Sequence, residues 1–410
     1  MRSHTAGLVF NFVLLVAAVL FTTAGAAEPE QPWKRHAIDD SSRGADGVRL
    51  ADVNQDGRLD IVTGWEEGGV VRVYQNPGPT RAREKWPSVT VGTTANVEDA
   101  VLVDIDGDGS LDVVSCAEGN TRRMFVHWAP SDRAKYLDAS AWTTGIIPAS
   151  VDRMMWMFSL PVQIDDKDGV DLFAGGKERG GQIGWWQAPK TPRRLEDWQW
   201  HNLRDAGWVM SLVSSDMDGD GDLDLVFSDR KGPRSGCFWL ENPGTNARLT
   251  EPWREHPIGG QGHEVMFLAL ADLDRDGLED VIVATKPKQL LFLRRLGRDG
   301  QQWERHEISL PENTGNAKAV NVGDINLDGA PDLVFTCEGS SDGKSGVMWL
   351  SNHGSTAKRD WQPHKISGPD GIKHDLVQLL DLDDDGDPDV LTCEETRNLG
   401  VFWYENPANR

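Results

Sequence analysis

Residues 52 to 60 carry four oxygen-bearing side chains at positions 1, 3, 5 and 9 of the stretch: Asp52, Asn54, Asp56 and Asp60. Carboxylates at this density repel one another and resist joint ionisation unless a cation lies among them. All the donors are hard oxygens, and a backbone carbonyl is available at position 7, which is the ligand set that calcium prefers. Magnesium requires stricter geometry and zinc prefers nitrogen or sulfur ligands. The stretch therefore predicts a calcium-binding loop.

Five further copies of this acidic loop follow, with their first positions at residues 104, 216, 272, 324 and 381. Position 6 is glycine in every copy, as a sharp turn requires. We expect about six calcium ions, and ion-free turns rich in aspartate are the alternative. The predicted ligands in these five copies are Asp104, Asp106, Asp108, Asp112, Asp216, Asp218, Asp220, Asp224, Asp272, Asp274, Asp276, Asp280, Asp324, Asn326, Asp328, Asp332, Asp381, Asp383, Asp385 and Asp389.

A seventh copy of the loop lacks two of these ligands. Gln163 replaces the carboxylate at position 1, and Lys167 stands at position 5. We expect no calcium here, because the ammonium of Lys167 can sit among Asp165, Asp168 and Asp171 in place of an ion.

The loops recur every 52 to 59 residues, a spacing typical of a repeat architecture. Two β-rich runs flank each loop and two more follow it, so each unit has four short strands, as in a β-propeller blade. We label these strands a to d from the axis outward, with the acidic loop between a and b. A Trp-led fourth strand at 33–38 precedes the first loop, and the chain ends after a third strand at 401–407. The sequence predicts an all-β, seven-bladed β-propeller, closed by the N-terminal strand joining the last blade.

The loops and their spacing resemble the calcium loops of FG-GAP/VCBS-type repeats, which form the propellers of integrin α-chains and of many secreted bacterial proteins. The resemblance covers about residues 33–407 and depends on the loops and the blade period, because the literal Phe-Gly and Gly-Ala-Pro words are absent. EF-hand loops begin similarly but carry Glu at position 12, where this chain has Thr63 or Ser115. The resemblance implies that the calcium loops lie at the blade bottoms and that the opposite face binds ligands.

The whole chain has 410 residues and a formal net charge of −23. We expect no nucleic-acid partner, because phosphate binding needs a basic face. The N-terminus has the basic, apolar and small-residue segments of a secretory signal, with an uncleaved anchor as the alternative. We assign 1–27 to the signal peptide and 28–410 to one propeller domain, and we expect a secreted, periplasmic or cell-surface location. No membrane span is expected in the mature chain. We also expect a monomer, and the four separated cysteines leave their disulfide state open.

The b–c and d–a loops should build the face opposite the acidic loops. Six residues after the last aspartate of each loop, blades 3 to 5 place the bases Lys177, Arg230 and Lys286, whereas the other blades place acids. Six residues before each loop the same blades place methionines, with Trp156 and Trp208 adjacent. These bases and aromatic residues predict a pocket for an anionic, sugar-like ligand. The alternative is a rim of solvated charges, with the methionines filling the central channel.

Two histidines, His263 and His374, fall in d–a loops beside carboxylates, where they could transfer protons. The histidines of the outer-strand repeat are expected to be structural: His36, His201, His256, His306 and His364. The sequence contains no nucleophile motif, phosphate-binding loop or zinc-ligand spacing. We therefore expect a calcium-stabilised binding or adhesion module for an extracellular glycan or protein ligand. The alternative is a carbohydrate-active enzyme of polysaccharide lyase or sugar dehydratase type, with its site on the top face.

Overall fold

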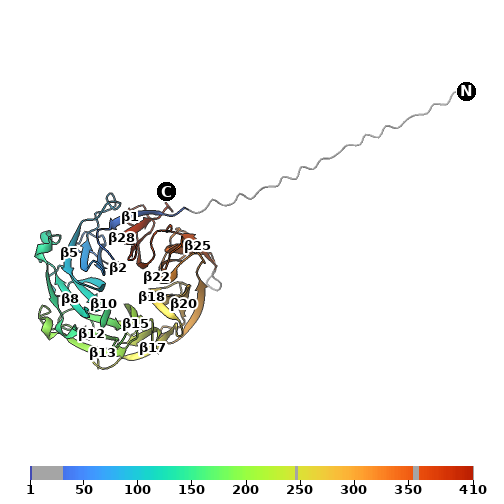
Figure 1. The fold of residues 1–410 in the computed structure, drawn as a ribbon. Coiled ribbons are helices and arrows are strands. Elements are labelled where there is room, and N and C mark those ends of the chain that lie inside the picture. Colours follow the sequence, from blue (N-terminus) through green and yellow to red (C-terminus); the bar gives the residue numbers. More distant parts are fainter. Residues whose placement is uncertain (2–30, 245–247, 354–359, 410) are drawn as a thin grey trace. The chain divides into compact units, whose positions relative to one another are not determined.

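The computed structural model describes Met1 and residues 31–244, 248–353 and 360–409. Apart from Met1, the predicted signal peptide, 1–27, lies outside the described residues. The described part of residues 31–409 forms seven antiparallel sheets of four strands each. Figure 1 shows these sheets arranged in a ring. The prediction of an all-β, seven-bladed propeller is confirmed.

Each sheet runs from strand a near the axis to strand d at the outside. The a strands are β2 (Ala45–Ala51), β6 (Val97–Val103), β10 (Met155–Val162), β14 (Val209–Ser215), β18 (Glu264–Ala271), β22 (Asn316–Gly323) and β26 (His374–Leu380). The b strands are β3 (Asp60–Trp65), β7 (Asp112–Ala117), β11 (Asp171–Lys177), β15 (Asp224–Asp229), β19 (Asp280–Lys286), β23 (Asp332–Glu338) and β27 (Asp389–Glu394).

The two outer positions complete the blades. The c strands are β4 (Val70–Tyr74), β8 (Arg123–Trp128), β12 (Gln182–Gln187), β16 (Gly236–Glu241), β20 (Gln289–Arg295), β24 (Val347–Asn352) and β28 (Gly400–Glu405). The d strands are β5 (Ser88–Thr93), β9 (Thr143–Ile146), β13 (Gln199–Asp205), β17 (Arg254–Gly259), β21 (Trp303–Ser309), β25 (Trp361–Lys365) and β1 (Lys34–Asp39). Short 3-10 turns occupy some connections: η1 (Arg133–Lys135), η2 (Ala139–Ala141), η3 (Pro148–Ser150) and η4 (Leu195–Asp197). Blade 1 begins at β2, and blade 7 contains β26, β27, β28 and β1.

Strand β1 closes the ring by pairing antiparallel with β28, and Figure 1 shows these two strands side by side. The imidazole Nε2 of His36 lies 2.6 Å from a carboxylate oxygen of Glu405 on β28. The backbone N–H of Trp33 donates to the carbonyl of Ile366 at 2.9 Å. The N-terminal strand thus covers the edge that the last blade would otherwise expose, as predicted.

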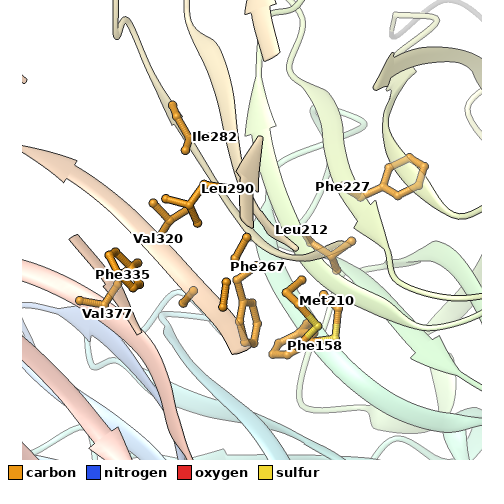
Figure 2. Packing of buried hydrophobic residues seen from close by; sticks show 14 of the residues in the cluster. Phe158, Met210, Leu212, Phe227, Phe267, Ile282, Leu290, Val320, Phe335 and Val377 are labelled. Atoms are coloured by element: carbon orange, nitrogen blue, oxygen red, sulfur yellow. The ribbon is translucent and has the colours of Figure 1, made fainter. Parts of the chain in front are cut away.

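Apolar side chains from the a strands of blades 3 to 5 pack together near the axis. Figure 2 shows Met210 close to Phe158, with Phe267 beside them. The rings of Phe158 and Phe267 meet edge to face, with their centres 5.4 Å apart. Met157 and Met266 are also fully buried in this cluster. The methionines therefore serve as packing residues, because their flexible side chains fill irregular space.

The outer-strand histidines stack on aromatic residues of the neighbouring c strand, which confirms that they are structural. The pairs are His36–Trp403, His201–Trp185, His256–Trp239, His306–Phe292 and His364–Trp349, with ring centres 4.1 to 5.4 Å apart. All four cysteines are buried and unpaired. Among the described residues, no helix has the length and apolar character needed to cross a membrane.

Candidate functional site

The acidic loops join strand a to strand b in their blades, so they lie at one edge of the ring of sheets. In four of these loops, three carboxylate oxygens lie within 4.8 Å of one another. The other two loops, in blades 1 and 6, have asparagine at position 3. Oxygen groups of this kind suit a hard cation such as calcium. The four groups are Asp104 with Asp106 and Asp108, Asp216 with Asp218 and Asp224, Asp272 with Asp274 and Asp276, and Asp381 with Asp383 and Asp385.

The same turn shapes all six loops. The glycine at position 6 has φ between 82° and 97°, in the left-handed region that a side chain would oppose. Its N–H donates to the position-1 carboxylate at 2.8 to 3.1 Å in every one of the six copies. This turn folds the loop back on itself and brings positions 1, 3 and 5 to one side.

The aspartate at position 9 has a structural role that the sequence analysis missed. In blade 4, Asp224 accepts hydrogen bonds from the backbone N–H of Met217, in its own loop, and of Asn242, just after strand c, both at 2.7 Å. Asp60 makes the same two bonds in blade 1. Burial raises the pKa of Asp224 to about 7 and that of Asp112 to about 8. This residue therefore fastens the loop to the sheet, in addition to any contact with an ion.

Arginine side chains from outside the loop supply part of the counter-charge at three loops. Arg193 of blade 3 reaches Asp106 of blade 2 at 2.5 Å. Arg83 contacts Asp383, and Arg294 contacts Asp274. These arginine side chains are 35 to 49% exposed. Each guanidinium therefore has access to solvent, and that of Arg83 also pairs with the buried carboxylate of Glu405.

The seventh loop, in blade 3, is held by an amide and not by an ammonium. The Nε2 of Gln163 donates to the carbonyls of Lys167, at 3.2 Å, and Gly169, at 2.7 Å. The ammonium of Lys167 lies 3.5 Å from Asp165, and the Lys167 side chain is 65% exposed. The expectation that Lys167 sits among three carboxylates is wrong, because this exposed side chain forms an ion pair with one of them. The position-9 residue, Asp171, keeps both of its backbone hydrogen bonds.

On the opposite face, the three bases of the predicted pocket pair with carboxylates of adjacent blades. Lys177 contacts Glu118 and lies 3.7 Å from Glu98. Arg230 donates to Glu264 of blade 5 at 2.7 Å. Lys286 contacts Glu338 of blade 6, and its ammonium also lies 3.7 Å from Glu264 of its own blade. These bases are therefore largely neutralised within the propeller, which the sequence analysis did not anticipate.

The two tryptophans of the predicted pocket have different surroundings. Trp156 is fully buried, and its indole N–H donates to the carbonyl of Ser150 at 3.0 Å. Its ring packs against Trp186 and Trp200 of the same blade, in a buried cluster that also contains residues of blade 2. Trp156 thus has no exposed face for a ligand, contrary to expectation. Trp208 is partly exposed and lies on the d–a loop beside Lys177.

The two candidate proton-transfer histidines have different surroundings. His374 is completely buried, and both ring nitrogens lack a hydrogen-bond partner among the described residues. Burial lowers the pKa of His374 to about 4, so the ring is neutral at pH 7. His263 is partly exposed and lies 3.5 Å from a guanidinium nitrogen of Arg305. Glu264, the residue that follows His263, accepts a hydrogen bond from Arg230 at 2.7 Å, so that carboxylate is engaged by a cation.

Several basic residues that the repeat positions did not single out share this face with the predicted pocket. Arg122 and Arg179 line a cavity of about 400 Å³ together with Lys177. Lys231 lies over the ring of Trp208, with its Nζ 4.4 Å from the ring centre. The sequence does place several basic residues in the b–c loops of blades 2 to 4. The sequence analysis missed them because it compared equivalent repeat positions, which considers only one residue of each loop.

Comparison with known proteins agrees with the geometry of the repeats. The FG-GAP-like repeat family matches residues 52–115, 272–335 and 324–392. Each match begins at position 1 of an acidic loop and ends in the b strand of the following blade. No curated protein matches the chain. The crystal structure of Saccharomyces cerevisiae Sqt1 matches with a TM-score of 0.47 and 10% identity, covering 92% of this chain and 99% of that chain. The chain is thus a seven-bladed β-propeller, and FG-GAP-like repeats match it in three places.

Proposed function

We propose that this protein is an exported binding module whose propeller is stabilised by calcium in six acidic loops, and whose opposite face carries the ligand site. The proposal rests on the difference between the loop of blade 3 and the acidic loops of the other six blades. In blade 3, where two ligands are replaced, the amide of Gln163 satisfies the carbonyl of Gly169 at position 7. The six other loops keep oxygen donors at positions 1, 3 and 5, which is the arrangement expected when an ion makes these contacts.

Binding is favoured over catalysis by the surroundings of the histidines. A lyase would need a general base near a cation that stabilises an enolate. His374 is buried away from solvent, and Lys177 and Arg230 are paired with carboxylates. The export part of the proposal depends on the signal-like sequence of residues 1–27.

Calcium binding is tested by thermal unfolding with and without a chelator, together with a count of bound ions by calorimetry. Calcium at tenfold excess over its dissociation constant stabilises by about 1.4 kcal/mol per site, and roughly 8 kcal/mol for six independent sites is an upper figure. Magnesium at the same concentration should stabilise much less, because it demands stricter geometry. A melting temperature that a chelator leaves unchanged would contradict the calcium proposal.

Paired variants locate the ions. Asp218→Ala removes an oxygen donor from a loop whose carboxylates lie together, and it should lower the ion count by one. Asp165→Ala changes the equivalent position of the blade 3 loop, where we propose no ion, and it should leave the count unchanged. If both variants lose an ion, or neither does, the assignment of six sites is wrong.

A further inference from the structure

The rim of the face opposite the acidic loops is continuous across blades 2 to 4, because its loops are hydrogen-bonded to one another. The N–H of Asp152, in the connection between blades 2 and 3, donates to the carbonyl of Arg122 in the b–c loop of blade 2 at 2.9 Å. The N–H of Arg230, in blade 4, donates to the carbonyl of Trp208 at 2.8 Å. The side chains on these loops are therefore held in a fixed order along one arc.

This arc is basic, although the chain as a whole carries a net charge of −23. We call its five cations the basic arc: Arg122, Arg123, Arg153, Arg179 and Lys231. None of the five forms an ion pair with a carboxylate of the described residues, in contrast to the bases nearer the axis. Three of them, Arg153, Arg179 and Lys231, are exposed to solvent. The arc is thus a row of cations without ion-pair partners among the described residues, with the carboxylates Asp152 and Glu178 on the same loops.

The indole of Trp208 concentrates positive charge at one end of the arc. The Nζ of Lys177, the Cζ of Arg230 and the Nζ of Lys231 lie 4.4, 4.5 and 4.4 Å from its ring centre. The face of the ring attracts each cation, while the cations repel one another. Lys177 and Arg230 have carboxylate partners, whereas Lys231 has none among the described residues. The ammonium of Lys231 is exposed to solvent, and it is therefore open to an anion.

A hollow lies along the arc between blades 2 and 3. Its volume is about 400 Å³, and its lining residues are Arg122, Met155, Lys177, Glu178, Arg179 and Gly180. The Nε–H of Arg122 is buried and has no acceptor among the described residues. An unsatisfied buried donor of this kind destabilises the folded protein. Turning the guanidinium toward the hollow breaks no hydrogen bond at Nε, and an anionic group there would supply the missing acceptor.

We propose that the basic arc binds an anionic polysaccharide, through carboxylate or sulfate groups that contact Arg122, Arg179 and Lys231 in succession. Guanidinium groups bind such oxyanions in a bidentate manner, and the bonds are charge-assisted. The cations come from successive loops and not from one point, so a ligand with repeated negative groups satisfies more of them than a small anion does. The proposal specifies the ligand class of the binding module proposed above, and it depends on that function.

A polysaccharide is favoured over nucleic acid by the charge on the rest of this face. Asp46, Glu66 and Glu395 of blades 1 and 7 bring carboxylate oxygens within 4.8 Å of one another. A wide, uniformly charged duplex covering the face would be repelled there, and it would need a larger basic surface. A narrow chain that follows the arc avoids the acidic sector. The acidic sector therefore directs the ligand along blades 2 to 4.

The test measures binding of the calcium-loaded protein to alginate and polygalacturonate, which carry carboxylates, and to dextran sulfate, with neutral dextran and single-stranded DNA as controls. The double variant Arg179→Glu/Lys231→Glu reverses two exposed, unpaired cations of the arc and should raise the Kd at least tenfold. The matched control Arg81→Glu/Arg298→Glu makes the same change in net charge at two exposed positions in c–d loops. It should change the Kd less than threefold. Binding of the unmodified protein should weaken as salt is raised from 50 to 200 mM.

The outcomes separate this inference from the proposed function. Tight binding to a carboxylated or sulfated glycan that is lost in the arc variant and kept in the control supports the inference. Absence of binding to every anionic glycan, unchanged binding by the arc variant, or stronger arc-dependent binding to DNA overturns it. Calcium-dependent melting is measured on the same samples. If melting depends on calcium but no anionic glycan binds, the ligand class is wrong and the calcium proposal stands; if a chelator has no effect, the calcium proposal fails whatever the glycan result.

Discussion

The side-chain amide of Gln163 donates to the backbone carbonyl of Gly169 at 2.7 Å, so one loop of the propeller is closed by a protein donor at the carbonyl proposed as a calcium ligand elsewhere. Gln163 and Gly169 occupy positions 1 and 7 of the blade 3 loop. Glutamine at position 1 leaves the fold of blade 3 like that of the other blades but changes the contacts that close its loop. Blade 3 therefore serves as an internal control for the six loops with the full set of oxygen donors.

Restoring the ligands should add an ion to blade 3. The double variant Gln163→Asp/Lys167→Asp recreates donors at positions 1 and 5, and it should raise the number of bound calcium ions by one, measured by calorimetry. Lys167→Ala alone should change the free energy of unfolding by less than about 1 kcal/mol, because an exposed ion pair contributes little. An unchanged ion count in the double variant would mean that the loop backbone excludes the ion.

Removing the position-9 carboxylate should destabilise even the blade without a proposed ion. Asp171→Asn replaces one carboxylate oxygen, an acceptor, with an amide NH2 group, a donor. This group then faces the backbone N–H of Ile164 or of Ala188. We expect a loss of about 2–3 kcal/mol in the free energy of unfolding, because a buried N–H is left unsatisfied. Urea unfolding measures this loss, and the exposed neighbour Asp168→Asn serves as the control with little effect. Equal losses in the two variants would contradict the role of Asp171 in fastening the loop.

The closing strand should contribute more stability than its terminal position suggests. Removing residues 31–39 deletes β1 and exposes the edge of β28, whereas a trim that ends at residue 30 keeps the strand. The first truncation should lower the melting temperature strongly and promote aggregation. His36→Ala should cost about 1–3 kcal/mol, because Glu405 loses its contact at 2.6 Å. A truncated protein that melts like the longer form would refute closure by β1.

The buried imidazole of His374 should make the protein sensitive to acid. Burial lowers its pKa in the folded state to about 4, below the value of about 6.5 expected in the unfolded chain. The unfolded state therefore takes up a proton first, and stability is lost as pH falls from about 6.5 toward 4. This loss should be about 2–3 kcal/mol from this one group.

The variant His374→Phe isolates this effect. The imidazole packs closely against Gly346 and Gly371: a Cβ added to these glycines would lie 2.2 and 2.5 Å from the ring. Phenylalanine keeps a ring in this space. Urea unfolding at several pH values gives the slope of stability against pH for each protein. The variant should show a shallower decline below pH 6.5 whatever its stability at pH 7. Parallel slopes would show that other groups cause the acid sensitivity.

The sequence alone determined the architecture, because the signals for it are local and repeated. Each acidic loop combines a position-6 glycine with regularly spaced oxygen donors, and each d strand has a tryptophan at its start. Repetition at a constant spacing leaves few arrangements besides a ring of equivalent blades. The d strand at 33–38 precedes the first loop, and the last blade lacks a d strand of its own. The N-terminal strand was therefore expected to cover the exposed edge of the last blade and close the ring.

Only the tertiary structure decided what the individual side chains contact, because those contacts join different blades. Trp156 and Trp208 looked equivalent in the sequence. In the structure Trp156 is fully buried, whereas the ring of Trp208 has three cations near it. Lys177 and Arg230 looked available for a ligand until carboxylates of neighbouring blades neutralised them. Spacing along the chain fixes the position of a residue within its own blade. The charge that faces it comes from residues about one repeat away in sequence, and only the folded ring brings them together.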